Sequence, residues 1–126
     1  MRLEEYFENT EGTGILSTAD DKGNVNCAIY AAPHVIDHET VGFIMRPRKS
    51  YGYVKSNPKA AYMFMELESA YRGIRLTLEK IGENNDPEDV DELRRSFRGG
   101  ADEGPSTIVN FKVTEIRPLV GEKLPE

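Results

Sequence analysis

The stretch Met45-Arg46-Pro47-Arg48-Lys49-Ser50-Tyr51 is a short basic loop between an apolar run and a pattern typical of a helix. Three of its four residues from Arg46 to Lys49 are basic. We expect Ser50 to cap the helix that follows, with free backbone N–H groups directed at the same point as the side chains of Arg48 and Lys49. This arrangement is typical of a phosphate site. A capped helix beside a solvated basic loop is the alternative.

The charge of the whole chain contrasts with this loop. The 126 residues carry a formal net charge of -6, so the local positive charge favours a small anion rather than a polyanion as partner. Nucleic-acid binding depends on several lysines and arginines spread over an extended face, and the sequence shows no such face. The composition therefore argues against a nucleic-acid-binding protein.

The length of the chain indicates one domain, residues 1–126. Its cysteine content indicates a reducing compartment. Cys27 is the only cysteine, so an intrachain disulfide is excluded. Glu4 and Glu5 lie where a signal peptide would be apolar, and no apolar stretch is long enough to cross a membrane. We expect a cytoplasmic protein that does not bind membranes.

Outside the basic loop, most of the chain has strand character. Short apolar or alternating runs bounded by turn residues predict strands at 14–19, 24–32, 34–36, 41–45, 60–65, 71–81 and 107–116. Helical patterns are confined to a leading helix in residues 1–10, a short helix at 50–56 and an appended helix at 86–99. This many closely spaced strands predicts a mainly β protein whose antiparallel sheet closes into a small barrel.

Two of the predicted strands carry expectations about burial. In the strand at 24–32, Val25, Cys27, Ile29 and Ala31 share one face, and Asn26, Ala28 and Tyr30 share the other. We expect the first face to be buried, with Cys27 as a small core residue; contact of Cys27 with a bound ring is the alternative. The strand at 60–65 is almost wholly apolar, which predicts burial on both faces.

Other candidate residues give weaker signals. His34 and His38 are the only histidines, and the strand-and-turn pattern around them does not favour a metal site. Gly12-Thr13-Gly14 lacks the context of a dinucleotide fingerprint, which favours a flexible entry to the first strand. The acidic residues in 66–68 and 102–103 are expected to be solvated. Arg72 and Arg75 are expected to face either the anion bound at the basic loop or solvent.

The sequence suggests no serine–histidine–aspartate set. The chemistry, if any, would therefore come from a cofactor.

The order of several motifs resembles the pyridoxamine 5'-phosphate oxidase-like, FMN-binding split-barrel family, over about residues 12–81. The motifs are Gly14-Ile15-Leu16-Ser17-Thr18, the Asp-Lys-Gly turn, Val25-Asn26-Cys27-Ala28, Val41-Gly42-Phe43-Ile44-Met45, Arg48-Lys49-Ser50 and Asn57-Pro58-Lys59-Ala60-Ala61. Each motif is weak alone, and their order and spacing carry the resemblance.

The resemblance implies a six-stranded antiparallel split barrel that forms a homodimer with FMN at the subunit interface. It implies that Arg48, Lys49 and Ser50 hold the FMN phosphate. It further implies that the strand segment Asn26, Cys27 and Ala28 borders the flavin ring and that the turn Met45, Arg46 and Pro47 lies beside it.

The resemblance does not extend to the C-terminal substrate segment of the true pyridoxamine phosphate oxidases, and the chain has no tryptophan. We therefore expect an FMN-dependent oxidoreductase or flavin reductase acting on another substrate. A non-catalytic flavin-binding or electron-relay protein, or a split barrel that binds haem or the deazaflavin F420, are the alternatives.

Overall fold

The fold is built almost entirely from strands, as the sequence predicts. It is described by a computed structural model that covers residues 1–68, 71–95 and 105–122. Within these ranges the helices are α1 (Leu3–Asn9), α2 (Lys49–Ser56) and α3 (Pro87–Arg95). The strands are β1 (Gly12–Ala19), β2 (Val25–Ile29), β3 (His34–Asp37), β4 (Thr40–Met45), β5 (Lys59–Glu66), β6 (Gly73–Asn84) and β7 (Thr107–Pro118).

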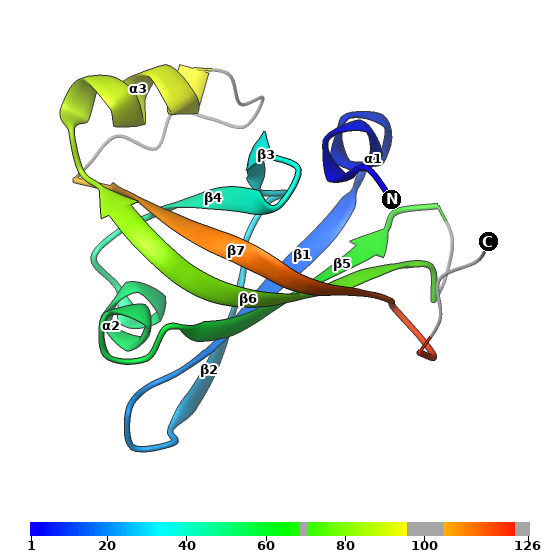
Figure 1. Ribbon diagram of the computed structural model, residues 1–126, viewed down its shortest axis with the longest axis horizontal. Helices are drawn as coiled ribbons and strands as arrows, with labels where there is room; N and C mark the ends of the chain where they lie inside the picture. Colours follow the sequence, from blue (N-terminus) through cyan, green and yellow to red (C-terminus); the bar gives the residue numbers. More distant parts are fainter. Residues whose placement is uncertain (69–70, 96–104, 123–126) are drawn as a thin grey trace.

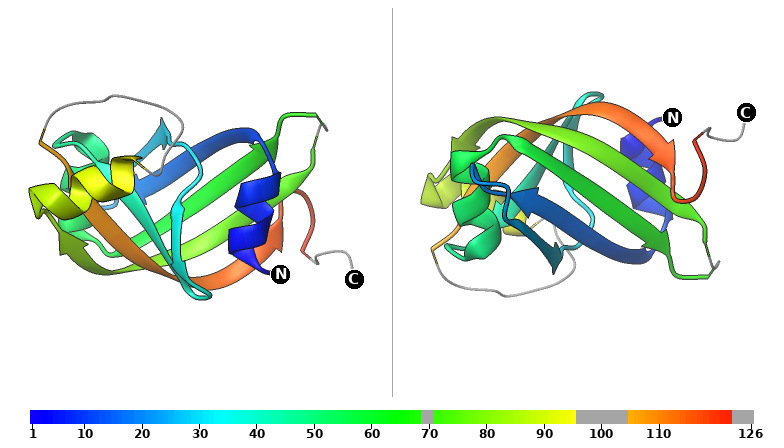
Figure 2. Two further views of the ribbon diagram at one scale, coloured as in Figure 1. Left: turned by 90° about the horizontal axis from the view of Figure 1, so that it is seen from above. Right: turned by 90° about the horizontal axis from the view of Figure 1, so that it is seen from below.

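The described strands form one sheet in the order β2-β1-β5-β6-β7-β4-β3, and all neighbouring pairs are antiparallel. This is one strand more than the six of the predicted split barrel. The sheet curves around the core, with β2 and β3 as its two edges (Figure 1). Helices α2 and α3 lie toward one end of the curved sheet and α1 toward the other, as the two views of Figure 2 also show.

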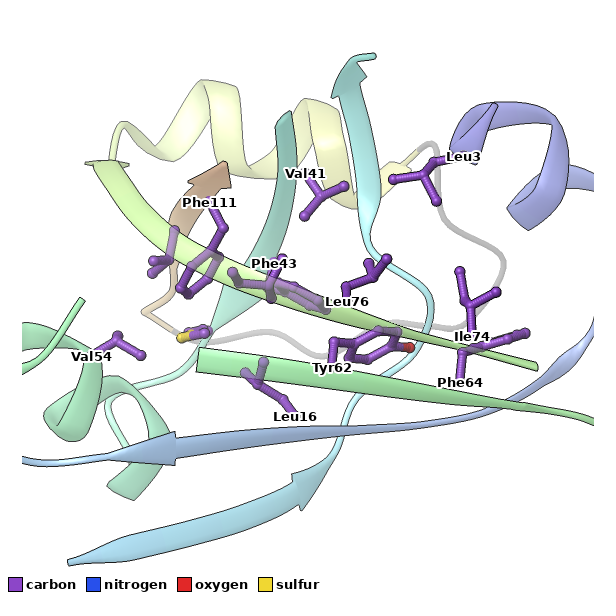
Figure 3. Packing of buried hydrophobic residues seen from close by; sticks show 13 residues of the cluster. Leu3, Leu16, Val41, Phe43, Val54, Tyr62, Phe64, Ile74, Leu76 and Phe111 are labelled. Atoms are coloured by element: carbon purple, nitrogen blue, oxygen red, sulfur yellow. The ribbon is translucent and has the colours of Figure 1, made fainter. Parts of the chain in front are cut away.

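The core lies on the concave face of the sheet. Alternation along β6 buries Ile74, Leu76 and Leu78, as its sequence pattern predicts. Side chains from β1, β4, β5, β6 and β7 meet there, and Val54 of α2 joins them (Figure 3). The buried cluster comprises Leu3, Leu16, Val41, Phe43, Met45, Val54, Tyr62, Phe64, Ile74, Leu76, Leu78, Val109 and Phe111.

The expected burial of the Cys27 face of β2 is wrong. Val25 is 80% exposed, Ile29 is 77% exposed and Cys27 is exposed. The register explains the error, because Asn26 and Ala28 pair with Thr18 and Leu16, the inward-facing residues of β1. The apolar side of β2 therefore faces away from the core of its own chain.

The expected two-sided burial of β5 is also wrong. Tyr62 and Phe64 are buried, whereas Ala61 on the opposite face is exposed and Met63 is half-buried. Helices cover only part of this sheet, so the outer face of β5 has no covering layer in the described chain. The apolar composition of β5 therefore does not mean that both of its faces are buried.

Gly12 and Gly14 lie inside β1, so the expected flexible entry to the first strand is also wrong. A Cβ atom on Gly14 would overlap the Tyr62 hydroxyl and the carbonyl oxygen of Tyr30. A Cβ atom on Gly12 would overlap the carbonyl of Met65. These glycines permit close packing of backbone and side chain.

The leading and appended helices lie where the sequence predicts them. Leu3 anchors α1 on the core, and Asp86 caps α3 by accepting hydrogen bonds from the N–H groups of Glu88 and Asp89. Residues 96–99 of the predicted 86–99 helix lie outside the described residues. None of the helices in the described ranges is long and apolar enough to cross a membrane.

Candidate cofactor site

The start of α2 presents backbone donors beside basic side chains. The first backbone hydrogen bond of the helix joins Gly52 N to Arg48 O at 3.0 Å. The N–H groups of Lys49, Ser50 and Tyr51 come before this first bonded donor, so they have no acceptor within the helix. The first turn contains no acidic residue, and the side chains of Arg48 and Lys49 are exposed. This geometry fits the predicted anion site.

Ser50 is not the N-cap, so this detail of the prediction is wrong. The N-cap is Arg48, whose N–H donates to Arg46 O at 2.7 Å in the tight turn that precedes α2. Ser50 is the second residue of α2, is only 4% exposed and accepts a hydrogen bond from Asn26 Nδ2 at 3.2 Å. Its hydroxyl joins the helix to the barrel wall.

Tyr30 is the residue that sequence reasoning missed at this position. It follows β2 on the same face as Asn26 and Ala28, so the alternation of the strand already placed it there. Burial raises the pKa of Tyr30, while a hydrogen bond with Ser50 and the charge of Arg48 act in the opposite direction. Tyr30 is half-buried, and its ring packs on Phe43 with 5.8 Å between ring centres.

The structure brings some of the predicted site residues together and separates others. Asn26 and Ser50 are hydrogen-bonded, and Arg48 and Lys49 lie at the start of the same helix. Ala28 is half-buried on the Asn26 face, whereas Cys27 faces the other side of the sheet. Arg46 is half-buried and Pro47 is exposed, whereas Met45 is only 1% exposed and lies within the core.

A hollow of about 310 Å³ adjoins the basic loop. Pro47 and Tyr51 form one wall, and Val90, Asp91 and Arg94 of α3 form another. The Arg94 guanidinium donates to Ser106 Oγ at 2.9 Å and lies 3.7 Å from Asp91 Oδ1. Helix α3 thus lies across this hollow from the basic loop.

A polar cluster on β6 fixes α2 in place. The Tyr51 hydroxyl donates to Glu83 Oε1 at 2.6 Å, and Lys80 Nζ pairs with Glu83 Oε2 and contacts Val54 O at 3.4 Å. Lys55 Nζ lies 5.3 Å from the centre of the Tyr51 ring. The hydrogen bonds from Lys80 and Tyr51 lower the pKa of Glu83. The position of the helix start is therefore set by side chains outside the anion site.

Several other candidates have structural partners elsewhere. Arg75 donates to the carbonyl oxygens of Pro118 and Gly121 at 2.9 and 2.6 Å, and Glu66 accepts from the Tyr6 hydroxyl at 2.8 Å. His38 lies 3.7 Å from Glu39. Across the described ranges, no group of three histidine, cysteine or acidic side chains is arranged to hold a metal ion.

The donor set at the start of α2 fits the phosphate of FMN. A phosphate monoester is acceptor-only in its dianionic form, and this site offers a guanidinium, an ammonium and backbone N–H groups without a competing carboxylate in the first turn. Arg48 and Lys49 with the first turn of α2 would hold the phosphate.

Comparison with known proteins agrees with this picture at the level of the fold. No family model matches the chain, and no curated protein matches it. An FMN-binding protein from Syntrophomonas wolfei superposes with a TM-score of 0.79 at 19% identity, covering 97% of this chain and 86% of that protein.

Two further solved structures are similar to the chain. A candidate pyridoxamine 5'-phosphate oxidase from Lactobacillus delbrueckii has a TM-score of 0.67 at 17% identity, covering 89% of this chain and 87% of that one. An F420 reductase has a TM-score of 0.64 at 20% identity, covering 89% of this chain and 94% of that one. The chain therefore has the split-barrel fold of the FMN-binding and pyridoxamine 5'-phosphate oxidase-like proteins, which confirms the fold predicted from its sequence.

Proposed function

We propose that this protein binds FMN and acts as an FMN-dependent oxidoreductase or flavin reductase. The observation that carries the proposal is the start of α2, where the exposed basic residues Arg48 and Lys49 adjoin the N–H groups of the first turn, which contains no acidic residue. The similarity of the fold to an FMN-binding protein supports the same ligand.

The energetics of the site are consistent with a nucleotide rather than free phosphate. Two or three charge-assisted hydrogen bonds contribute roughly 1.5–3 kcal/mol each, which is near or below the roughly 8 kcal/mol of a micromolar complex. Burial of an aromatic ring would supply the remainder. The strand segment around Asn26 and Ala28 and the turn at Arg46 and Pro47 are the proposed neighbours of that ring.

When bound, FMN would supply the transfer of hydride or single electrons between a reductant and an acceptor. The residues of the protein would bind and orient this cofactor. The α2 start fixes the phosphate, the Glu83 cluster keeps α2 against β6, and α3 shields one side of the hollow beside Pro47 and Tyr51.

We also propose that the protein is a homodimer with FMN at the interface. The outer face of β2, β1 and β5 carries the exposed side chains of Val25, Cys27, Ile29 and Ala61. The register places Ile29 beside Ile15, and Ile15 beside Met63, in one row across the three strands. An exposed apolar patch of this kind is typical of a protein–protein interface.

The test is an absorbance spectrum of the purified protein, followed by extraction and identification of any chromophore and by titration with FMN monitored by flavin fluorescence. We expect a bound flavin, or micromolar affinity for added FMN. A colourless protein that leaves the fluorescence of added FMN unchanged contradicts the proposal.

A second candidate is a non-catalytic flavin-binding or electron-relay protein. The side chains gathered at the start of α2, namely Asn26, Arg48, Lys49 and Ser50, are suited to binding and orientation, which favours this candidate. Negligible turnover with NADH and NADPH across common acceptors, despite bound FMN, would support it. The same spectrum distinguishes haem and F420, and one similar structure is an F420 reductase.

A further inference from the structure

We infer that the hollow between the basic loop and α3 is a second ligand site, which binds a small organic carboxylate through the guanidinium of Arg94. The inference goes beyond the proposed function, because this site forms without a flavin. The hollow measures about 310 Å³, close to the lower limit of the roughly 300–1,000 Å³ that is usual for ligand pockets. A hollow of this size admits a small organic molecule.

Arg94 offers donors that the fold does not use. Its side chain lines the hollow and is only 18% exposed, so its charge is largely removed from solvent. Within the described part of the chain it makes one hydrogen bond, from Nη2 to Ser106 Oγ at 2.9 Å, and one ion pair, in which Nη1 lies 3.7 Å from Asp91 Oδ1. A guanidinium has five N–H donors in a fixed fork. Most of these donors are therefore available to a ligand, and a carboxylate accepts two of them at once.

The charges around the hollow favour a monoanion. The 3.7 Å separation of Arg94 and Asp91 exceeds hydrogen-bond distance, and the Asp91 side chain is 60% exposed, so solvent screens this pair. Arg46 and Arg48 flank Pro47, which also lines the hollow. Arg94 is the single basic residue among the described residues of the lining. One lining cation suits the single charge of a carboxylate better than the double charge of a phosphate.

The other walls of the hollow suit the carbon skeleton of such a molecule. Pro47, Pro87 and Val90 contribute apolar surface. Tyr51, which also lines the hollow, is held in place because its hydroxyl donates to Glu83 Oε1 at 2.6 Å. Walls that are fixed before binding reduce the conformational entropy lost when a ligand enters. The expected ligand is therefore a carboxylate with a compact apolar body.

The test is titration of the purified protein with benzoate, and with benzyl alcohol as a neutral molecule of similar size, followed by backbone amide resonances in NMR spectra. We expect benzoate to bind with millimolar or tighter affinity and to shift the resonances of Val90 and Arg94. Benzyl alcohol should bind at least about tenfold more weakly, because it cannot form charge-assisted hydrogen bonds. Saturation with FMN should leave the affinity for benzoate unchanged.

Arg94→Gln should weaken benzoate binding at least about tenfold, since it removes the charged donors. Arg95→Gln is the matched control, because Arg95 is an exposed neighbour on α3 and its replacement changes the net charge equally. It should bind benzoate like the wild type.

A second variant keeps the inference falsifiable if Arg94→Gln is poorly folded. Asp91→Asn removes the carboxylate that competes for Arg94, so it should strengthen benzoate binding about threefold. Glu88→Gln is its control, since Glu88 is an exposed acid of α3 outside the lining of the hollow, and it should leave the affinity unchanged.

Three results overturn the inference. They are absence of benzoate binding at millimolar concentration, equal binding of benzoate and benzyl alcohol, and an affinity for benzoate that is unchanged in both Arg94→Gln and Asp91→Asn. Loss of benzoate binding on saturation with FMN also overturns it, because the hollow would then belong to the flavin site. Wild-type protein that fails to bind FMN overturns the proposed function alone, so the two failures are distinguishable.

Discussion

At the scale of residues, the basic side chains of this chain differ in what they do. Arg75 donates to one carbonyl oxygen at the end of β7 and to another in the turn that follows, and Lys80 pairs with Glu83. Arg48 and Lys49 instead extend from the start of α2 as exposed side chains. The first pair stabilises the fold, and we assign the second pair to the ligand.

Lys49→Ala should weaken FMN binding by about 1–3 kcal/mol, because it removes one charge-assisted hydrogen bond to the phosphate. The thermal unfolding midpoint should stay near that of the wild type, since the Lys49 side chain is exposed. Fluorescence titration measures the affinity, and circular dichroism measures the midpoint.

Lys112→Ala is the matched control, because Lys112 is an exposed lysine on β7 and its removal changes the net charge equally. It should bind FMN like the wild type. Equal weakening in both variants would mean that net charge, rather than a contact from Lys49, sets the affinity.

The sequence indicated the basic residues of the site but not their buried support. A run of Arg48, Lys49 and Ser50 before a helical pattern is visible from local spacing alone. The hydrogen bond between Asn26 and Ser50 joins residues of β2 and α2, which are 24 positions apart in the chain. Such contacts follow from the sheet register, which local patterns do not specify.

At the scale of elements, α2 is held by its polar side as well as by its apolar side. Val54 enters the core, while Tyr51 and the backbone of Val54 are tied to the Lys80–Glu83 pair of β6. The Glu83 side chain is 28% exposed, so solvent screens part of this interaction. The anchor therefore contributes modestly to stability.

Glu83→Gln should lower the free energy of unfolding at pH 7 by about 0.5–1 kcal/mol. The folded protein has a lowered pKa for Glu83 relative to the ordinary value of 4.5, so the ionised form is favoured by folding. This contribution is fully present above the ordinary pKa and is lost as the pH falls through the lower folded value. Urea unfolding of wild type and variant at pH 7 and pH 3 should show the difference shrinking at pH 3.

Glu79→Gln is the control for this measurement. Glu79 pairs with Lys59 at 3.2 Å, but its side chain is 43% exposed, so its replacement should change stability less than that of Glu83. A Glu83→Gln difference that is equal at both pH values would show that ionisation of Glu83 does not contribute.

Element types were more predictable than the faces that the elements bury. The Asp86-Pro87 start of α3 and the Asp-Lys-Gly turn ending at Gly23, where φ is +85°, are local signals that can be seen in the sequence. The buried faces of β2 and β5 were wrong because apolar character alone does not say whether the chain's own core or another surface covers it. Only the pairing of these strands with β1 settles the question.

At the scale of the whole molecule, the sheet has one face around its core and one partly bare apolar face. Val25 and Ile29 lie on the bare face, on the edge strand β2. The proposed homodimer would cover this face and would explain the apolar outer residues of β5. A small antiparallel barrel was predictable from the number and spacing of strands, and the split barrel from the family resemblance. The strand order was not predictable, because β1–β5 and β4–β7 pair across long stretches of chain.

Ile29→Lys should convert the proposed dimer to a monomer, because a buried unpaired charge at an interface is unfavourable. Light scattering of the wild type should give twice the 14.2 kDa mass of one chain. Ile81→Lys is the matched control, since Ile81 is also exposed, at 58%, but lies on β6 and outside the patch of β2, β1 and β5, and it should remain dimeric. A monomeric wild type contradicts the proposal.

The order of the strands also has a consequence for how the chain acquires its fold. Strand β1 is made early with its hairpin partner β2, but its other neighbour is β5, and Gly12 pairs with Glu66. During synthesis at about 5–20 residues per second, β1 would wait on the order of seconds for that partner. In this interval its inward-facing Leu16 has no completed core to enter, so the nascent hairpin is the stage at which association with other chains competes most strongly with folding.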